Sequence, residues 1–233
     1  MQKQEKIVEM FNEIAPSYDK ANKVLSFGID AKWRFDAISK VKEHINLNSN
    51  LNIADIACGT GDMCALLKQI PNSKVIGIDP SKGMLEVAKK RFLDVEFELG
   101  YANKLPLADE SVDLITISYG FRNVVEKDEA LEEFRRVLKP NGVLLVLEFF
   151  KREKGGIIGF FRDFYLKKIL PIIGGMLSKN KAAYEYLPNS IDDFYSNDEF
   201  KEKLKEHKFS LKLFKTYSFG VSSLFIVSKD ASK

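Results

Sequence analysis

The feature that most constrains the fold is a regular alternation of short apolar runs and helical stretches that begins near residue 50. Each run of five to seven residues ends at a turn signal, and an amphipathic stretch follows most of them. The last run before the basic segment, 143–149, is almost continuously apolar, which is typical of a strand covered on both faces. This alternation predicts a mostly parallel sheet with helices on both faces. The expected strands are 51–56, 74–78, 95–99, 112–118, 143–149, 209–214 and 221–227.

The two ends of the chain complete this expectation. Apolar residues at helical spacing in 7–14 predict an N-terminal amphipathic helix, and a C-terminal helix is expected over 198–206. The connection 217–220 is short enough for a hairpin, so we expect the last of seven strands to run antiparallel to the others.

The 233 residues suit one domain with a full core. Within it we expect an N-terminal helical cap (1–45), a ligand-binding core (50–150), a basic and apolar insertion or lid (151–195), and a C-terminal helix with a strand pair (196–230). Two cysteines cannot form a disulfide framework, which favours a reducing, cytoplasmic location. Two histidines far apart in sequence argue against a zinc site, so no metal is expected.

Charge is nearly balanced overall, and the net charge of +3 is too small to suggest a nucleic-acid-binding surface. The segment 151–181 differs, because it holds eight basic and two acidic residues among bulky apolar ones. Such a segment is typical of a membrane-surface or lid element. A solvated helix packed on its own domain is the alternative.

The loop after the first expected strand carries the first chemical signal. Gly59 and Gly61 lie between a strand and a helix, where glycines let the backbone approach a ligand closely. Asp79 follows at the end of the second strand, where a carboxylate can accept hydrogen bonds from a ribose. Either a methyl-donor site or a nicotinamide site fits this pattern, although Cys64 stands where a dinucleotide fingerprint has its third small residue. A tight turn with a helix-capping aspartate is the purely structural alternative.

The segment Asp55-x-Ala57-x-Gly59-x-Gly61 resembles motif I of class I S-adenosylmethionine-dependent methyltransferases, with alanine in place of the first glycine. Three longer stretches resemble a narrower family, the demethylmenaquinone/2-polyprenyl-benzoquinol C-methyltransferases. They are 11–19 (FNEIAPSYD) continuing to Trp33, 115–124 (ITISYGFRNV), and 136–142 (RVLKPNG) ending in Leu147-Glu148-Phe149.

The chain departs from the family pattern at three positions. Asp30 stands where the family has histidine, and Asn141 replaces a glycine. Tyr101-Ala102 replaces the usual Asn/Asp-Ala pair beside adenine, so Tyr101 can offer only its backbone as the acceptor.

The resemblance implies a Rossmann-like class I methyltransferase that uses S-adenosylmethionine to methylate a ring carbon of a polyprenyl quinol. It implies that the methionine part of the cofactor lies against the loop after the first strand, the ribose against Asp79, and adenine beside Tyr101 and Ala102. Ser118 is expected on the far side of the cofactor, although packing alone also explains a small residue there. The loop residues in this assignment are Asp55, Gly59, Thr60 and Gly61.

Carbon methylation requires the quinol to lose a phenolic proton, so a base or a cation that favours the phenolate is expected. The candidates are Arg122, Asn123, Tyr18 and Asp30. Arg122 is the first choice as phenolate stabiliser, and an ion pair with Glu126 or Asp128 is its structural alternative. A carboxylate or an ordered water can serve as the base.

Several alternatives stay open at this point. The substrate can be a naphthoquinol, a benzoquinol or both, and a methyltransferase of this fold acting on another small phenol is the second hypothesis. A nicotinamide oxidoreductase is disfavoured because the chain has no Tyr-x-x-x-Lys dyad, and a non-enzymatic membrane-peripheral protein would leave the glycine loop unexplained. A tail that resides in the bilayer favours peripheral contact of 151–181 with the inner membrane face. The sequence does not indicate an oligomeric state.

Overall fold

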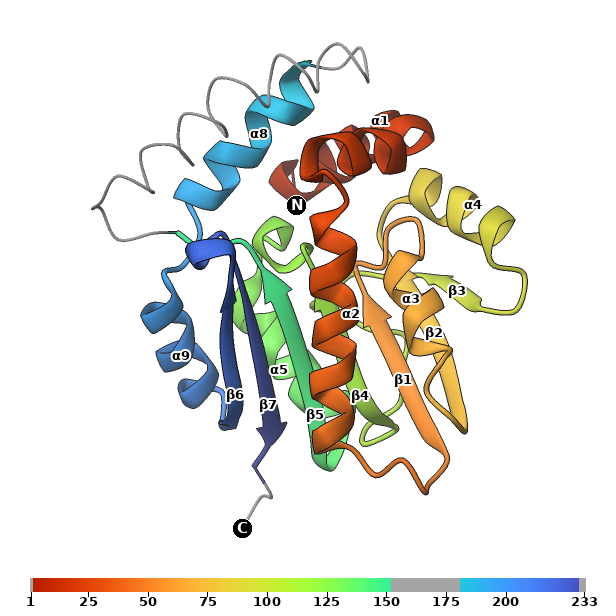
Figure 1. Cartoon of the computed structure of the whole chain (residues 1–233), viewed down its shortest axis with the longest axis vertical. Helices are drawn as coiled ribbons and strands as arrows, with labels where there is room; N and C mark the ends of the chain where they lie inside the picture. Colours follow the sequence, from red (N-terminus) through yellow and green to blue (C-terminus); the bar gives the residue numbers. More distant parts are fainter. Residues whose placement is uncertain (1, 152–180, 231–233) are drawn as a thin grey trace.

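A computed structural model describes residues 2–151 and 181–230 and contains a seven-stranded sheet in the order β3-β2-β1-β4-β5-β7-β6 (Figure 1). All neighbouring strands pair in parallel except β7, which is antiparallel to both β5 and β6. The strands are β1 (Leu51–Ile56), β2 (Ser73–Asp79), β3 (Glu96–Leu99), β4 (Val112–Ser118), β5 (Leu138–Glu148), β6 (Phe209–Tyr217) and β7 (Ser222–Lys229).

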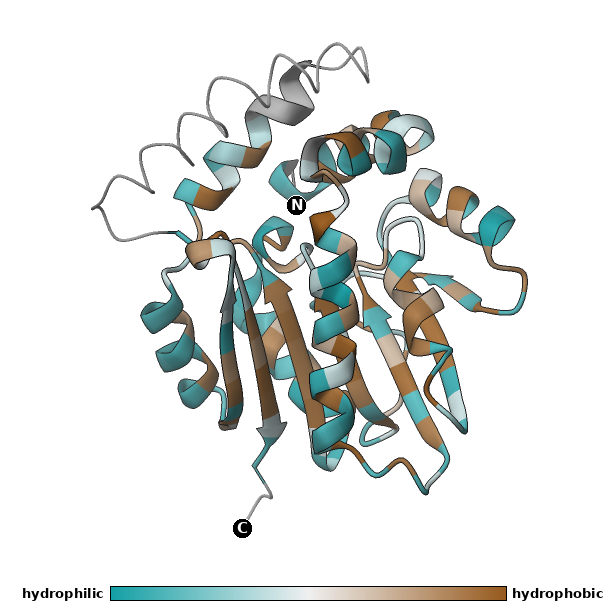
Figure 2. Ribbon diagram, viewed as in Figure 1, coloured by the Kyte–Doolittle hydropathy of each residue, from teal (hydrophilic) through white to brown (hydrophobic). Residues whose placement is uncertain are grey.

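Helices cover both faces of this sheet. The α-helices are α1 (Gln2–Ser26), α2 (Ile29–Val41), α3 (Asp62–Leu67), α4 (Lys82–Arg91), α5 (Lys127–Val137), α8 (Lys181–Asp192) and α9 (Asn197–Glu206). Short 3-10 turns are η1 (Lys42–His44), η2 (Phe121–Asn123) and η4 (Ser218–Gly220). One apolar core joins α2, α3 and α4 to the first face, and a second joins α5 and α9 to the opposite face. The central strands are correspondingly hydrophobic along most of their length (Figure 2).

Helix α1 lies across the edge of the sheet at which the parallel strands end, and α8 lies beside it (Figure 1). A small separate cluster of Ile14, Ala15, Ala21 and Met84 packs α1 onto α4. Because α1 belongs to neither main core, it forms a cover over the sheet edge.

The seven expected strands and the antiparallel direction of the last one are confirmed. The strand expected at 143–149 begins earlier, because β5 starts at Leu138 directly after α5 and contains a register shift opposite Val112 and Leu114. Asn141 lies at this irregularity with a φ of 62°, a left-handed conformation that asparagine tolerates better than most side chains. Most of the expected insertion, 152–180, lies outside the described residues.

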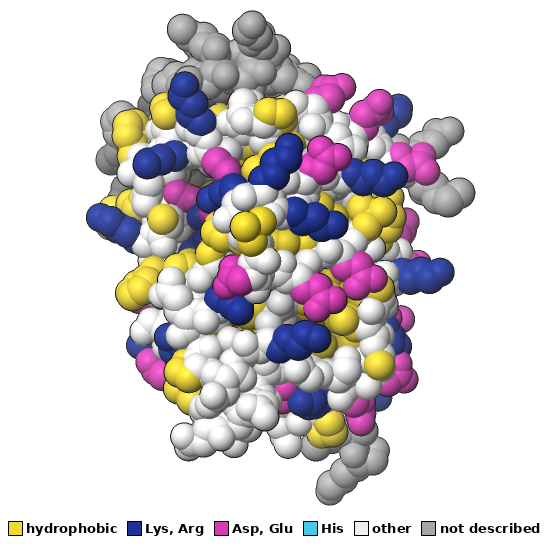
Figure 3. Space-filling view, turned by 90° about the vertical axis from the view of Figure 1, so that its right-hand side faces the viewer, with side chains coloured by type: hydrophobic (Ala, Val, Ile, Leu, Met, Phe, Trp, Pro, Cys, Tyr) yellow, Lys and Arg dark blue, Asp and Glu magenta, His cyan; other side chains and the backbone are white. Residues whose placement is uncertain are grey.

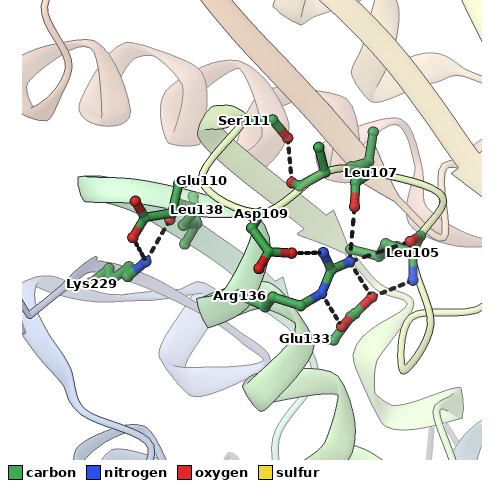
Figure 4. Close-up of polar contacts among 10 residues, drawn as sticks. Leu105, Leu107, Asp109, Glu110, Ser111, Glu133, Arg136, Leu138 and Lys229 are labelled. Carbon is green, nitrogen blue, oxygen red and sulfur yellow. Dashed lines mark hydrogen bonds and ion pairs between the residues drawn. The ribbon is translucent and has the colours of Figure 1, made fainter.

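A polar network fixes the connection between β3 and β4. Arg136 of α5 pairs with Glu133 at 2.7 Å and with Asp109 at 2.5 Å, and donates to the carbonyl of Leu107 at 2.9 Å (Figure 4). Glu133 also accepts the backbone N–H of Leu105.

The face shown in Figure 3 interleaves acidic, basic and apolar side chains, so this side of the molecule has no continuous basic stripe.

Candidate active site

A cavity of about 730 Å³, including its open mouth, lies at the carboxyl ends of β1, β2 and β4, under α1. Its wall is formed by α1 and by the loops that follow β1, β2, β3 and β4. The lining residues are Gln4, Ile7, Val8, Phe11, Tyr18, Ala57, Gly59, Asp79, Pro80, Ser81, Met84, Tyr101, Ala102, Asn103, Ser118, Tyr119, Gly120, Asn123 and Val124.

The loop from β1 to α3 turns through two left-handed glycines. Gly59 has a φ of 56°, and a Cβ built on it meets open space. Gly61 has a φ of 89°, and a Cβ there would lie 2.9 Å from the ring of Phe92. The loop therefore needs glycine at 61 for packing, whereas the space beside Gly59 belongs to the cavity.

Asp79 ends β2 and lies in the cavity wall. Its carboxylate accepts the backbone N–H groups of Gly59 and Ser81, each at 2.8 Å. Burial raises the pKa of Asp79 to about 6, and these two hydrogen bonds oppose the shift. A carboxylate has about four acceptor sites, so two remain for a ligand.

Asp55 lies behind the loop and does not line the cavity. It is 1% exposed and accepts hydrogen bonds from Thr116 Oγ1 at 2.6 Å and Cys64 Sγ at 3.3 Å. Burial raises the pKa of Asp55 to about 7, against the effect of these two donors. Thr60 and Gly61 also lie outside the lining.

Helix α1 closes the cavity through polar contacts with two loops. Asn12 Oδ1 accepts from Ser81 Oγ at 2.7 Å and from the backbone N–H of Gly83 at 2.9 Å. Asp19 accepts from Thr60 Oγ1 at 2.5 Å and pairs with Arg91 of α4 at 2.7 Å. Thr60 thus joins the glycine loop to helix α1, which covers the cavity.

Tyr101, Ala102 and Ser118 all line the cavity, as their expected roles require. Ala102 is buried, whereas Tyr101 is 40% exposed. The hydroxyl of Ser118 is buried and has no hydrogen-bond partner within residues 2–151 and 181–230. A buried unpaired hydroxyl at a cavity wall is suited to a polar group of a ligand.

Arg122 does not line the cavity, and the alternative expectation of an ion pair with Glu126 or Asp128 is wrong. Its guanidinium pairs with Glu148 at 2.7 Å and donates to the carbonyl of Tyr119 at 2.6 Å. Asp128 instead pairs with Lys203 and lies within hydrogen-bond distance of His207. Glu148 was named within a family stretch but given no role, although an acid inside the apolar run 143–149 signals a buried partner.

Of the other three catalytic candidates, two line the cavity and one does not. Tyr18 and Asn123 line the cavity, and Tyr186 of α8 donates to Asn123 Oδ1 at 3.1 Å. Asp30 is outside the lining and pairs with Arg34 at 2.6 Å. Asn12 and Arg91 were also given no role from the sequence, because their contacts with Ser81 and Asp19 depend on tertiary structure.

Among the described residues, no group of His, Cys, Asp or Glu side chains is arranged to hold a metal ion. No helix within the same residues is both long and apolar enough to cross a membrane.

Comparisons with known proteins identify the family of the chain. Residues 1–229 match the model of the ubiE/COQ5 methyltransferase family. The chain is 58% identical to the "Ubiquinone/menaquinone biosynthesis C-methyltransferase UbiE" of Campylobacter jejuni over 237 residues, covering 98% of this chain and 100% of that protein. It is 40% identical to a "Demethylmenaquinone methyltransferase" of Thermotoga maritima, covering 94% of each chain.

Solved structures support the fold independently. A SAM-dependent methyltransferase from Aquifex aeolicus has a TM-score of 0.63 at 20% identity, covering 91% of this chain and 97% of that one. A SAM-dependent methyltransferase from Thermotoga maritima, titled a possible histamine N-methyltransferase, has a TM-score of 0.65 at 23% identity, covering 96% and 100%. The fold is therefore that of Rossmann-like methyltransferases, and the full-length sequence match shows that the chain belongs to the ubiE/COQ5 methyltransferase family.

Proposed function

We propose that this enzyme uses S-adenosylmethionine to methylate a ring carbon of a demethylated polyprenyl quinol, converting demethylmenaquinol to menaquinol. The corresponding benzoquinol of ubiquinone synthesis is a second substrate of the same site. The observation that carries the proposal is the 58% identity, over essentially the full chain, to a relative named for both pathways. The cavity under α1 is where we place the reaction.

The residues around the cavity fit this cofactor. Gly59 leaves open space beside the backbone, Asp79 keeps acceptor sites for ribose hydroxyls, and the Ser118 hydroxyl lacks a partner in the described part of the chain. Tyr101 and Ala102 line the wall that we assign to adenine. When bound, the cofactor supplies a methyl group activated by a positively charged sulfur.

We assign the remaining expected cofactor residues a supporting role. Asp55 holds the end of β1 to β4 through Thr116, and Gly61 lets the loop pass Phe92. Thr60 fastens the loop to α1 through Asp19, so that the cover over the cavity excludes water from the reaction.

On the substrate side we assign contacts with the quinol oxygens to Tyr18 and Asn123, because both line the cavity. Burial raises the pKa of Tyr18, so its hydroxyl stays neutral and donates a hydrogen bond. Arg122 positions the loop of Tyr119 and Asn123 through its bonds to Glu148 and to the Tyr119 carbonyl. Asp30 acts on the site indirectly, through its ion pair with Arg34.

The test is incubation of the purified protein with labelled S-adenosylmethionine and a panel of demethylated naphthoquinols and benzoquinols. Mass spectrometry and NMR should locate the label on a ring carbon, and a product methylated on oxygen would contradict the proposal. Gly59→Ala should weaken cofactor binding about tenfold or more in calorimetry, because its Cβ enters the cavity. Gly220→Ala is the matched control, since Gly220 is also left-handed with open space beside it but lies in η4.

We extend the proposal to location. A polyprenyl substrate resides in the bilayer, so the basic segment 151–181 would meet the cytoplasmic face of the membrane. Charge reversal at Lys167 and Lys168 should then weaken sedimentation with anionic vesicles, and unchanged sedimentation would reject this contact.

A further inference from the structure

Two phenylalanines project into solvent from turns at the carboxyl edge of the sheet. Phe27, between α1 and α2, is 85% exposed, and Phe219, in η4 between β6 and β7, is 79% exposed. Both have left-handed backbones, with φ of 53° and 58°. A bulky residue rarely adopts this conformation, which costs on the order of 1 kcal/mol or more. Both turns are therefore under backbone strain.

The elements that carry the two turns are in contact. Trp33 of α2 stacks on Tyr217, the last residue of β6, with ring centroids 6.0 Å apart. One turn further along α2, Asp36 accepts hydrogen bonds from Tyr217 Oη and Lys215 Nζ, each at 2.7 Å. Helix α2 starts and β6 ends at the same edge of the sheet, so the turn between α1 and α2 and the turn η4 both lie at that edge (Figure 1).

The surroundings of Phe27 are apolar at the centre and basic at the edge. Val24 and Ile29 are also exposed beside it. Lys20, Lys23 and Lys32 are exposed, and no ion pair joins them to an acid in the part of the chain that the structure describes. The nearest acid on α2, Asp30, is already paired with Arg34.

We propose that Phe27 and Phe219, with Val24 and Ile29 and the lysines Lys20, Lys23 and Lys32, form a docking surface that inserts into the headgroup region of an anionic phospholipid bilayer. Aromatic side chains in a basic surround suit this interface, where apolar rings enter the acyl boundary and ammonium groups meet phosphates. This inference rests on the proposed function, because a polyprenyl substrate must reach the cavity at the same sheet edge from a bilayer. It involves described residues that are separate from the segment 151–181.

The first test places a reporter at each phenylalanine. Phe27→Trp and Phe219→Trp, each corrected for the emission of the single native Trp33, are mixed with vesicles of phosphatidylglycerol and phosphatidylcholine. Both reporters should shift to shorter wavelength and be quenched by lipids labelled in the upper acyl chain. Leu93→Trp is the matched control, because Leu93 is 90% exposed but lies between α4 and the amino end of β3, and it should show neither change.

The second test removes the aromatic rings. Phe27→Ser/Phe219→Ser should reduce vesicle affinity about tenfold or more, while leaving unchanged the methylation of a short-tailed, water-soluble quinol without vesicles. Vesicle binding with unquenched reporters, an unchanged affinity of the double variant, or a wavelength shift that follows protein concentration without lipid would each overturn the proposal. The short-tail assay tests the proposed reaction separately, so failure of one does not imply failure of the other.

Discussion

Replacing Arg122 by methionine is the most informative perturbation of this structure. The Arg122 and Glu148 side chains are 8% and 0% exposed, and the pair joins η2 to the end of β5. Glu148 also accepts the backbone N–H groups of Arg122 and Phe149, at 3.1 and 2.7 Å. Methionine fills a similar apolar volume but leaves Glu148 buried without a counter-charge.

The expected cost follows from this environment. Removing one partner of a buried ion pair costs about 3–5 kcal/mol, because the remaining charge is uncompensated. The two backbone donors stay with Glu148, which places the expected loss near the lower end, at about 3 kcal/mol. For a chain of 233 residues this corresponds to a fall of roughly 6–12 °C in Tm.

Urea and thermal unfolding, followed by the fluorescence of the single Trp33, measure this loss. Arg122→Met/Glu148→Met removes both charges and should recover to within about 1 kcal/mol of the original protein. A loss below about 1 kcal/mol in the single variant would refute the argument that Arg122 compensates Glu148. An Arg122→Met protein of unchanged stability and abolished activity would instead place Arg122 against the substrate.

Two further predictions concern a buried carboxylate and the polar network at the β3–β4 connection. Because burial raises the pKa of Asp55 to about 7, from about 3.9 in the unfolded chain, its contribution to stability is complete below pH 4 and is lost as the pH rises towards 7. Between pH 5 and 8 the free energy of unfolding should therefore fall by about 2–3 kcal/mol more in the original protein than in Asp55→Asn, and parallel pH profiles in urea unfolding would contradict this. Arg136→Met should release the β3–β4 connection, lowering stability by about 1 kcal/mol and weakening cofactor binding in calorimetry. Lys74→Met, which removes only an exposed 3.6 Å pair with Glu96, is its control and should change stability by less than about 0.5 kcal/mol.

Much of the fold could be predicted from local sequence because the signals are local. Apolar runs bounded by turns determine where strands begin and end, and 51–56 and 112–118 match β1 and β4 residue for residue. The glycine loop and Asp79 were also predictable, since strand ends in a parallel sheet meet at one edge. The start of β5 was not, because the Lys139-Pro140-Asn141-Gly142 segment has turn composition and only pairing with β4 makes it a bulged strand.

The side-chain partners at the site were decided by tertiary structure alone. The sequence by itself determined which residue types stand at the strand ends, since backbone preference and hydrophobic period act over a few neighbours. It could not determine that Arg122 meets Glu148, 26 positions later, or that Asp19 of α1 meets Thr60, 41 positions later. Those pairs form only when the sheet and its covering helix are assembled, because burial makes each charge or hydroxyl take the nearest partner that packing brings within reach.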